Sequence, residues 1–445
     1  MAGKLGISTG IATAVGLGAI IGAGIFALSG TAIATAGANA LFAFLLVGIV
    51  AILVALEVGE LVSIFPNAKG AAYSYVYNAF GSELGFITGV ISFFSYSTAI
   101  SVISLSFGAY FSSAFGMSSA IYSIPIAIVL ICSLAIVNLF GIKKATASDT
   151  VLVVIKSCVL LIFVGFAVFF AFHSGGIRLS NFSIGPGQGG FAAIFTASVV
   201  IFFAYSGFQT ISTFASRIKG GQLSAVKAII YAVLISIVLY VLVIVALLVL
   251  MPASMYTVNA DPLSVALKSV GAPTWLFLLI DFGALIATAS AALANTLSSS
   301  RILYQISEDG LLPTVLRKYN KRNDVAVNGT ILSAAVGIIM LFSGNVLIMA
   351  AISNFGLLFA YLMISLAVIH FRKVGKKGGF SAPFYPYLQV IAIIALLAFM
   401  YGMPRESLII GVLLILSLLV IYYSLREVKS KKVVRIRLFG NRSLK

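Results

Sequence analysis

The sequence predicts an all-α membrane protein with twelve transmembrane helices. Of its 445 residues, 61% are hydrophobic and only 9% are charged, whereas a soluble domain averages about 25% charged residues. Long stretches contain no Asp, Glu, Lys or Arg, such as those between Lys4 and Glu57 and between Glu83 and Lys143. Because one membrane-spanning helix needs about 20 apolar residues, each stretch has room for one or two spans. This composition excludes a soluble enzyme.

Twelve apolar runs can be delimited, because clusters of Gly, Pro, Asn and charged residues separate them. We interpret each run as one membrane span. The predicted spans are residues 8–31, 38–64, 84–112, 121–140, 150–172, 191–216, 226–251, 273–299, 328–343, 346–370, 387–403 and 406–424.

The positions of the basic residues support an even number of spans. If the N-terminus lies in the cytoplasm, 24 of the 28 Lys and Arg residues fall in cytoplasmic segments and only Arg178, Lys268 and Arg405 fall outside. Cytoplasmic loops are enriched in Lys and Arg, so we expect a multi-pass protein of the cell membrane, embedded in the lipid bilayer, with both termini cytoplasmic. The net charge of +17 then reflects topology and not nucleic-acid binding. The basic cytoplasmic tail, residues 426–445, is expected either to anchor the topology or to touch anionic lipid.

Two spans contain glycine-rich segments near their middles, and these segments predict broken helices. The first span carries four glycines between residues 16 and 24, and the sixth carries the segment Phe203–Gly207. If the sixth span is the counterpart of the first, each repeat has five spans, and this odd number inverts the second repeat relative to the first. The sequence therefore predicts one transmembrane transporter domain, residues 1–425. Its parts are a first inverted repeat at 8–172, a second at 191–370 and two extra C-terminal helices at 387–424.

A broken helix in a membrane exposes backbone N–H and C=O groups, and such breaks survive only where they line a cavity or are covered by protein. A free helix N-terminus suits a carboxylate, and free carbonyl groups suit an ammonium group. An α-amino acid carries both groups on one carbon atom, so we expect an amino acid site between the two breaks. The alternative is that Gly22 and Gly24 only permit close helix packing.

Four segments in the expected order resemble the amino acid–polyamine–organocation (APC) superfamily of transporters, and the resemblance covers nearly the whole chain. They are Gly18–Phe26 (GAIIGAGIF) in the first span, Phe65–Tyr73 (FPNAKGAAY) after the second, Phe203–Phe208 (FAYSGF) in the sixth, and Ser300–Pro313 (SRILY to DGLLP) at the exit from the eighth.

The resemblance implies that backbone groups hold the substrate. The amides of Ala23 and Gly24 would bind the carboxylate, and Gly207 would permit the sixth span to unwind. Phe203 would also cover the pocket with its ring. The carbonyl groups implied to hold the ammonium belong to Ile20, Phe203, Ala204 and Ser206. No cofactor, metal or partner subunit is implied.

Lys156 lies inside the fifth predicted span, where a charge is costly and indicates a functional residue by default. The alternative is that its long side chain reaches the membrane surface. Some APC transporters are similar in having a lysine here, whose amine takes the place of a bound sodium ion. The resemblance implies contacts with the carbonyls of Gly18 and Ile21 and with the Ser290 hydroxyl. Because burial disfavours the charged form of a lysine, we expect Lys156 to couple transport to protons.

Other polar residues in the spans have less certain roles. Asp281 in the eighth span either pairs with a cation or senses protons, which makes it the second coupling candidate, or is hydrated at the outer membrane edge. For Glu57 and Glu60, on one face of the second span, we expect structural roles. Gln209 stands where many APC transporters carry an acid, which favours neutral over basic substrates.

The predicted function is therefore proton-coupled uptake of neutral amino acids by alternating access. One alternative is an amino acid exchanger without ion coupling. The other is a channel or sensor that reuses the fold, although a channel would be expected to expose a continuous polar or charged stripe, which the sequence lacks.

Overall fold

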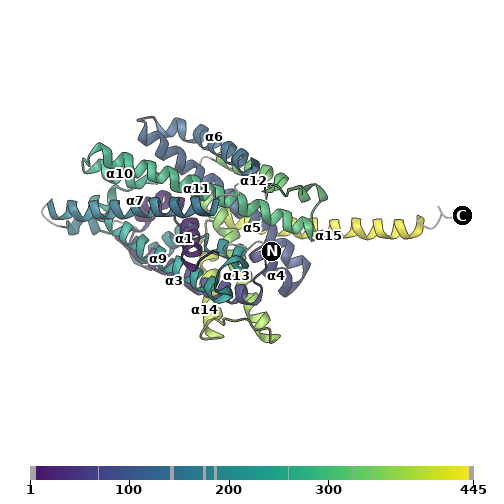
Figure 1. The fold of residues 1–445 in the computed structure, drawn as a ribbon. Coiled ribbons are helices and arrows are strands. Elements are labelled where there is room, and N and C mark those ends of the chain that lie inside the picture. The colour runs from purple at the N-terminus through teal and green to yellow at the C-terminus, as the bar shows by residue number, and fades with distance from the viewer. Residues whose placement is uncertain are drawn as a thin grey trace.

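The fold is almost entirely helical, as predicted (Figure 1). The computed structural model describes residues 7–68, 70–140, 145–173, 177–184, 188–258, 260–323, 325–343 and 345–439. Its α-helices are α1 (Thr9–Ile20), α2 (Ala23–Ala36), α3 (Ala40–Ile64), α4 (Ala72–Phe80), α5 (Ser82–Ala114), α6 (Ser119–Phe140), α7 (Ala145–His173), α8 (Gly190–Ile201), α9 (Gly221–Leu250), α10 (Pro262–Ser269), α11 (Thr274–Glu308), α12 (Val327–Leu341), α13 (Val346–Lys373), α14 (Tyr387–Tyr401) and α15 (Arg405–Phe439).

Short 3-10 helices and one hairpin complete the described part of the chain. The hairpin pairs β1 (Tyr319–Asn320) with β2 (Val325–Ala326) in antiparallel register. The 3-10 helices are η1 (Gly37–Asn39), η2 (Leu179–Phe182), η3 (Phe202–Tyr205), η4 (Phe208–Arg217), η5 (Ala253–Met255) and η6 (Thr314–Arg317).

The apolar helices fit a multi-pass membrane protein. Within the described ranges, nine helical stretches are long and apolar enough to cross a membrane, and α2 and α3 together form one of these stretches. Three further apolar helices, α1, α12 and α14, are shorter. Each of the twelve predicted runs thus corresponds to helical structure in the described part of the chain.

Several predicted runs differ from the structure in their bounds or geometry. The eighth run, residues 273–299, corresponds to α11, which continues to Glu308. The sixth run, residues 191–216, is α-helical only as far as Ile201 and continues as the 3-10 helices η3 and η4. The last run was predicted to end at residue 424, but α15 continues to Phe439, and Figure 1 shows it projecting from the helical body. The side chains after residue 424 and residues 440–445 lie outside the described part, so the predicted contacts of the basic tail are not described.

Small residues allow the central helices to approach one another. The α5 helix packs against α6, α11 and α13, and nearly all of its length is buried. Ser95 of α5 donates to the Ser353 carbonyl of α13 at 2.6 Å, and the Ser353 hydroxyl donates back to the Ser95 carbonyl at 3.0 Å. Such close contacts between small residues are the usual way in which helices associate within lipid.

The two broken helices are held together at one end as well as at their middles. Ile7, just before α1, donates its amide to the Arg217 carbonyl at 3.0 Å and accepts from the Lys219 amide at 2.8 Å. The N-terminal segment is therefore paired with the chain that leaves η4.

Candidate functional site

The first helical run breaks where its glycines predict. The α1 helix ends at Ile20, Ile21 and Gly22 leave the helical conformation, and α2 begins at Ala23. Ala23 and Gly24 occupy the first turn of α2, where amides have no partner within the helix. Gly22 has no side chain to cap them. These two amides therefore form a helix N-terminus suited to an anion.

The second break packs directly against the first. Gly207 adopts φ +112°, a left-handed conformation that favours glycine, between η3 and η4. A Cβ atom on Gly207 would lie 2.6 Å from the Ala19 carbonyl oxygen, and one on Gly24 would lie 2.6 Å from the Ala204 Cβ. Glycine is required at both positions because the two broken segments touch there.

Sequence reasoning missed Tyr240 of α9, whose hydroxyl reaches both breaks. Its oxygen lies 2.8 Å from the Ile20 carbonyl oxygen and 3.0 Å from the Ala204 carbonyl oxygen. Its side chain is fully buried. One hydroxyl has one hydrogen to donate, so the two carbonyls share the single hydrogen of Tyr240, which lies between the two breaks. The only available signal was a tyrosine within a long aliphatic run that also contains Tyr231, and this pattern is more typical of packing.

The remaining predicted ligands of the ammonium group lie within the second break. The Phe203 carbonyl accepts from the Ser206 amide at 3.0 Å and from the Ser206 hydroxyl at 2.7 Å. The Phe203 ring is buried, with 5% of its surface exposed. All the predicted substrate-binding residues are thus gathered at the two breaks.

Lys156 of α7 reaches the first break from the other side. Its Nζ atom lies 2.5 Å from the Gly18 carbonyl oxygen, 2.9 Å from that of Ile21 and 3.0 Å from the Ser290 hydroxyl oxygen of α11. Only 1% of the residue is exposed, so the side chain does not extend to the surface. These acceptors suit an ammonium group with three hydrogens. The amine therefore joins α1, α7 and α11.

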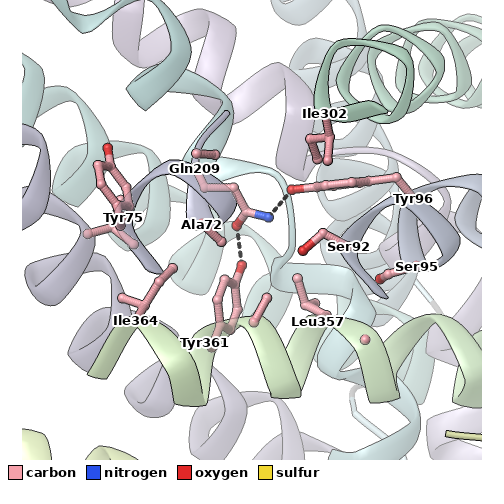
Figure 2. A pocket seen from close by; sticks show the side chains of 14 residues that line it. Ala72, Tyr75, Ser92, Ser95, Tyr96, Gln209, Ile302, Leu357, Tyr361 and Ile364 are labelled. Carbon is pink, nitrogen blue, oxygen red and sulfur yellow. Dashed lines mark hydrogen bonds between the residues drawn. The ribbon is translucent and has the colours of Figure 1, made fainter. Parts of the chain in front are cut away.

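A pocket lies beside the breaks on the η4 side and not at the breaks themselves. Figure 2 shows the Gln209 side chain between two tyrosines. Its amide nitrogen donates to the Tyr96 hydroxyl oxygen, and its amide oxygen accepts from the Tyr361 hydroxyl. The other lining residues are Val58, Ala71, Ala72, Tyr75, Ser92, Ser95, Ile302, Gly356, Leu357, Ala360 and Ile364. The lining contains no acidic side chain among the described residues.

Asp281 lies far along α11 from Ser290 and contacts α10. Its Oδ1 atom accepts from the Ser264 hydroxyl, and its Oδ2 atom is buried without a hydrogen-bond partner in the described part of the chain. The side chain is fully buried, which differs from the alternative of a residue hydrated at the membrane edge. Its role in coupling stays a prediction.

Comparison with known proteins identifies the family. The model of the amino acid permease family matches residues 12–431. A methylthioribose transporter of Bacillus subtilis is 31% identical over 88% of this chain and 87% of its own length. The branched-chain amino acid permease BcaP of Lactococcus lactis is 30% identical over 94% of both chains. Cationic amino acid transporter 3 of Arabidopsis thaliana is 29% identical over 81% of this chain and 61% of its own length. The resemblance seen in the four sequence segments is therefore confirmed, and the chain belongs to the amino acid permease family of the APC superfamily, as a multi-pass membrane transporter and not an enzyme.

Proposed function

We propose that this protein is a secondary active transporter that takes up neutral amino acids together with protons by alternating access. The observation that carries the proposal is the contact between the two broken helices at Gly24, Ala204 and Gly207. Two breaks in contact bring free amides and carbonyls side by side. An α-amino acid requires both kinds of group.

In this proposal the carboxylate binds the first-turn amides of Ala23 and Gly24, and the ammonium binds carbonyls at the two breaks. The Tyr240 hydroxyl already contacts the carbonyls of Ile20 and Ala204. Each carbonyl oxygen has two lone pairs, so an ammonium group can bond beside the tyrosine. The carbonyls of Phe203 and Ser206 complete the proposed set, and the Phe203 ring covers the bound substrate.

Two observations favour neutral side chains over basic ones. The pocket beside the breaks has the neutral amide of Gln209, and both ends of that amide are already hydrogen-bonded to tyrosines. Similar permeases from Bacillus subtilis and Lactococcus lactis are named for branched-chain amino acids. We therefore propose aliphatic amino acids such as leucine as substrates.

Methylthioribose is the second candidate substrate, because a transporter named for it is 31% identical to this chain. This sugar has neither a carboxylate nor an ammonium group, so it would not use the amides of Ala23 and Gly24 as an amino acid would. Competition between the two compounds therefore tests the proposed site itself.

Lys156 is the proposed coupling residue. As an ammonium group it bridges α1, α7 and α11 at the first break, in the way a bound cation would. Loss of its proton would weaken these contacts and favour the other access state. Asp281 is the second candidate for this role. An exchanger without ion coupling, or a channel or sensor, is the alternative if neither residue matters.

We further propose the architecture that this mechanism needs. It has twelve spans in one domain, residues 1–425, with inverted repeats 8–172 and 191–370 and two extra helices at 387–424. Both termini would lie in the cytoplasm of a cell whose plasma membrane holds the protein. The placement of 24 of 28 basic residues supports this topology. Labelling from outside intact cells should modify a cysteine placed at Ser119 but not one placed at Lys318.

The deciding experiment is uptake by purified protein in proteoliposomes. Labelled leucine, arginine and methylthioribose are each supplied under an imposed proton gradient, an imposed sodium gradient, or neither. Accumulation of leucine under the proton gradient alone is the expected result. Leucine exchange without accumulation would favour the uncoupled exchanger, and uptake of methylthioribose alone would contradict the amino acid site.

A further inference from the structure

Glu57 is a buried acid that the proposed mechanism does not use. It lies on α3, and none of its surface is exposed. Its Oε2 atom accepts from the Ser365 hydroxyl of α13 at 2.5 Å. Its Oε1 atom is buried and has no hydrogen-bond partner among the described residues. Only one of the two carboxyl oxygens therefore has a hydrogen-bond partner in the described part of the chain.

Charged groups near Glu57 do not neutralise it. Glu60 lies one turn along α3. Its carboxylate accepts two hydrogen bonds from the Arg372 guanidinium of α13, at 2.7 and 2.6 Å, and one from the Ala382 amide at 2.8 Å. The other titratable groups on helices packed against α3 are exposed or bonded elsewhere. The exposed ones are Arg217, Lys227, Tyr231, Lys373, Tyr387 and Tyr401. Tyr205, Tyr240 and Tyr361 bond to other groups, and His370 packs on Phe80.

Buried charges in proteins are normally paired, and an unpaired carboxyl group is neutralised instead. In the described part of the chain no cation contacts Glu57, so the buried arrangement seen here suits the protonated acid. The ionised form would be stabilised only by water. An open state that admits water to this region would therefore favour the ionised form.

Ser365 connects Glu57 to the tyrosine beside the pocket. The Ser365 hydroxyl has one hydrogen and two acceptors, the Glu57 carboxyl oxygen at 2.5 Å and the Tyr361 carbonyl oxygen at 3.2 Å. If Glu57 is protonated, it can donate to Ser365, which then donates to Tyr361. If Glu57 is ionised, it takes the Ser365 hydrogen and releases the Tyr361 carbonyl. Bonds from a serine to the carbonyl four residues earlier bend helices, so the proton on Glu57 alters α13 beside Tyr361.

We propose that Glu57 is a protonation-dependent positioning residue of the transport cycle, which acts through Ser365 and Tyr361 on the Gln209 bridge, the two hydrogen bonds that join Gln209 to Tyr96 and Tyr361 in the pocket lining. The proposal rests on the transport function proposed above but not on proton coupling through Lys156. Protonated Glu57 stabilises the hydrogen bonds of Gln209 to the two tyrosines, and ionised Glu57 favours the breaking of these bonds. The rate of exchange should consequently rise with pH.

The test is exchange of labelled leucine against unlabelled leucine in proteoliposomes containing the full-length chain. The pH is set equal on both sides and varied from acidic to alkaline, so that no proton gradient drives transport. For wild type we expect exchange to accelerate as pH rises. The Glu57→Gln variant, which mimics the neutral acid, should exchange at the wild-type acidic rate at every pH.

Ser365→Ala is the second variant, and it leaves the acid in place. Without this hydroxyl, the proton on Glu57 no longer reaches the Tyr361 carbonyl through a hydrogen bond, so the rise of exchange with pH should be lost. A merely structural contact would lower the rate at every pH and leave the rise in place. Glu83→Gln is the matched control, because Glu83 is a partly exposed carboxylate that accepts from Tyr423, and its profile should match wild type.

The outcomes separate this inference from the proposed function. A pH-dependent rise that survives unchanged in Glu57→Gln overturns the inference and leaves the transporter intact. If Glu57→Gln does not yield folded protein, a rise with pH that persists unchanged in Ser365→Ala overturns it equally. Absence of leucine exchange in wild type overturns the proposed neutral amino acid transport, and the inference falls with it.

Discussion

The Nζ atom of Lys156 lies 3.0 Å from the Ser290 hydroxyl oxygen, and this contact joins the middle of α7 to α11. The same nitrogen contacts two carbonyls at the end of α1. A single amine therefore contacts three helices at the point where the first one breaks. The following prediction tests whether this group is the site of coupling.

Lys156→Ala should abolish accumulation of leucine driven by a proton gradient, while exchange is partly kept because the proposed substrate site is made of backbone groups. Lys156→Arg should also lose proton-driven accumulation of leucine, because arginine stays charged throughout the cycle. Ser290→Ala should weaken coupling without abolishing it, since it removes one hydrogen bond to a charged group, worth about 1.5–3 kcal/mol. The measurement is uptake in proteoliposomes against the size of the proton gradient. Unchanged accumulation by Lys156→Ala would exclude Lys156 and make Asp281 the residue to substitute next.

Gly24→Val should abolish leucine binding while leaving folded, extractable protein. A Cβ atom at this position would clash with the Cα and Cβ atoms of Ala204, so a branched side chain would force the two breaks apart. The matched control is Gly165→Val on α7, where a Cβ atom would have nothing within 4 Å, and transport should persist. Binding is measured as leucine-dependent thermal stabilisation of the detergent-solubilised protein. Normal stabilisation of the Gly24→Val protein by leucine would mean that the substrate binds elsewhere.

Gln209→Glu should extend transport to arginine. The hydroxyls of Tyr96 and Tyr361 can both donate to a carboxylate at this position, because Tyr361 already donates and the Tyr96 hydrogen can rotate. The added negative charge would attract a basic side chain in the pocket. Uptake of labelled arginine, with leucine uptake measured in parallel, checks this expectation. Gln209→Met is the control of similar length without charge, and arginine uptake by that variant would contradict an electrostatic cause.

The helical runs and the positions of the two breaks could be predicted because each has a strong local signal. Long apolar runs mark the helices, and glycines such as Gly22 and Gly207 mark the breaks. The expected neighbours of Lys156 came from family resemblance and not from spacing, because contacts between residues 18, 156 and 290 depend on tertiary packing. The same limit explains why Tyr240 was missed and why Glu57 was expected to be structural. A single polar atom in an apolar run does not reveal which distant carbonyl or hydroxyl it will meet.

The 3-10 conformation of η3 and η4 was also beyond prediction. Apolar residues continue past Gly207 among Gln, Thr and Ser residues, and this mixture does not distinguish an α-helix from a 3-10 helix. Within η3, the Phe203 carbonyl accepts from the Ser206 hydroxyl and the Ala204 carbonyl accepts from the Tyr240 hydroxyl. The second of these donors lies on another helix, so its contact could not be read from the local sequence.

Tyr240→Phe should destabilise the protein and at the same time increase its stabilisation by substrate. The wild-type hydroxyl is shared between the carbonyls of Ile20 and Ala204, and its removal leaves buried acceptors short of a donor, at a cost of about 1–3 kcal/mol. If the ammonium group of leucine binds these same carbonyls, bound leucine restores part of the lost hydrogen bonding. The gain in melting temperature on adding saturating leucine should therefore be larger for Tyr240→Phe than for wild type.

The control for this prediction is Tyr231→Phe on the same helix, because Tyr231 is 50% exposed. This variant should change neither the stability of the protein nor the gain in melting temperature on adding leucine. Equal stabilisation by leucine in wild type and Tyr240→Phe would mean that the ammonium group does not reach the Ile20 and Ala204 carbonyls. Tyr240 would then hold the two breaks together without contact to the substrate. A loss of stability with no loss of leucine affinity would agree with that purely structural role, whereas a larger stabilisation by leucine requires the substrate and the tyrosine hydroxyl to share the same acceptors.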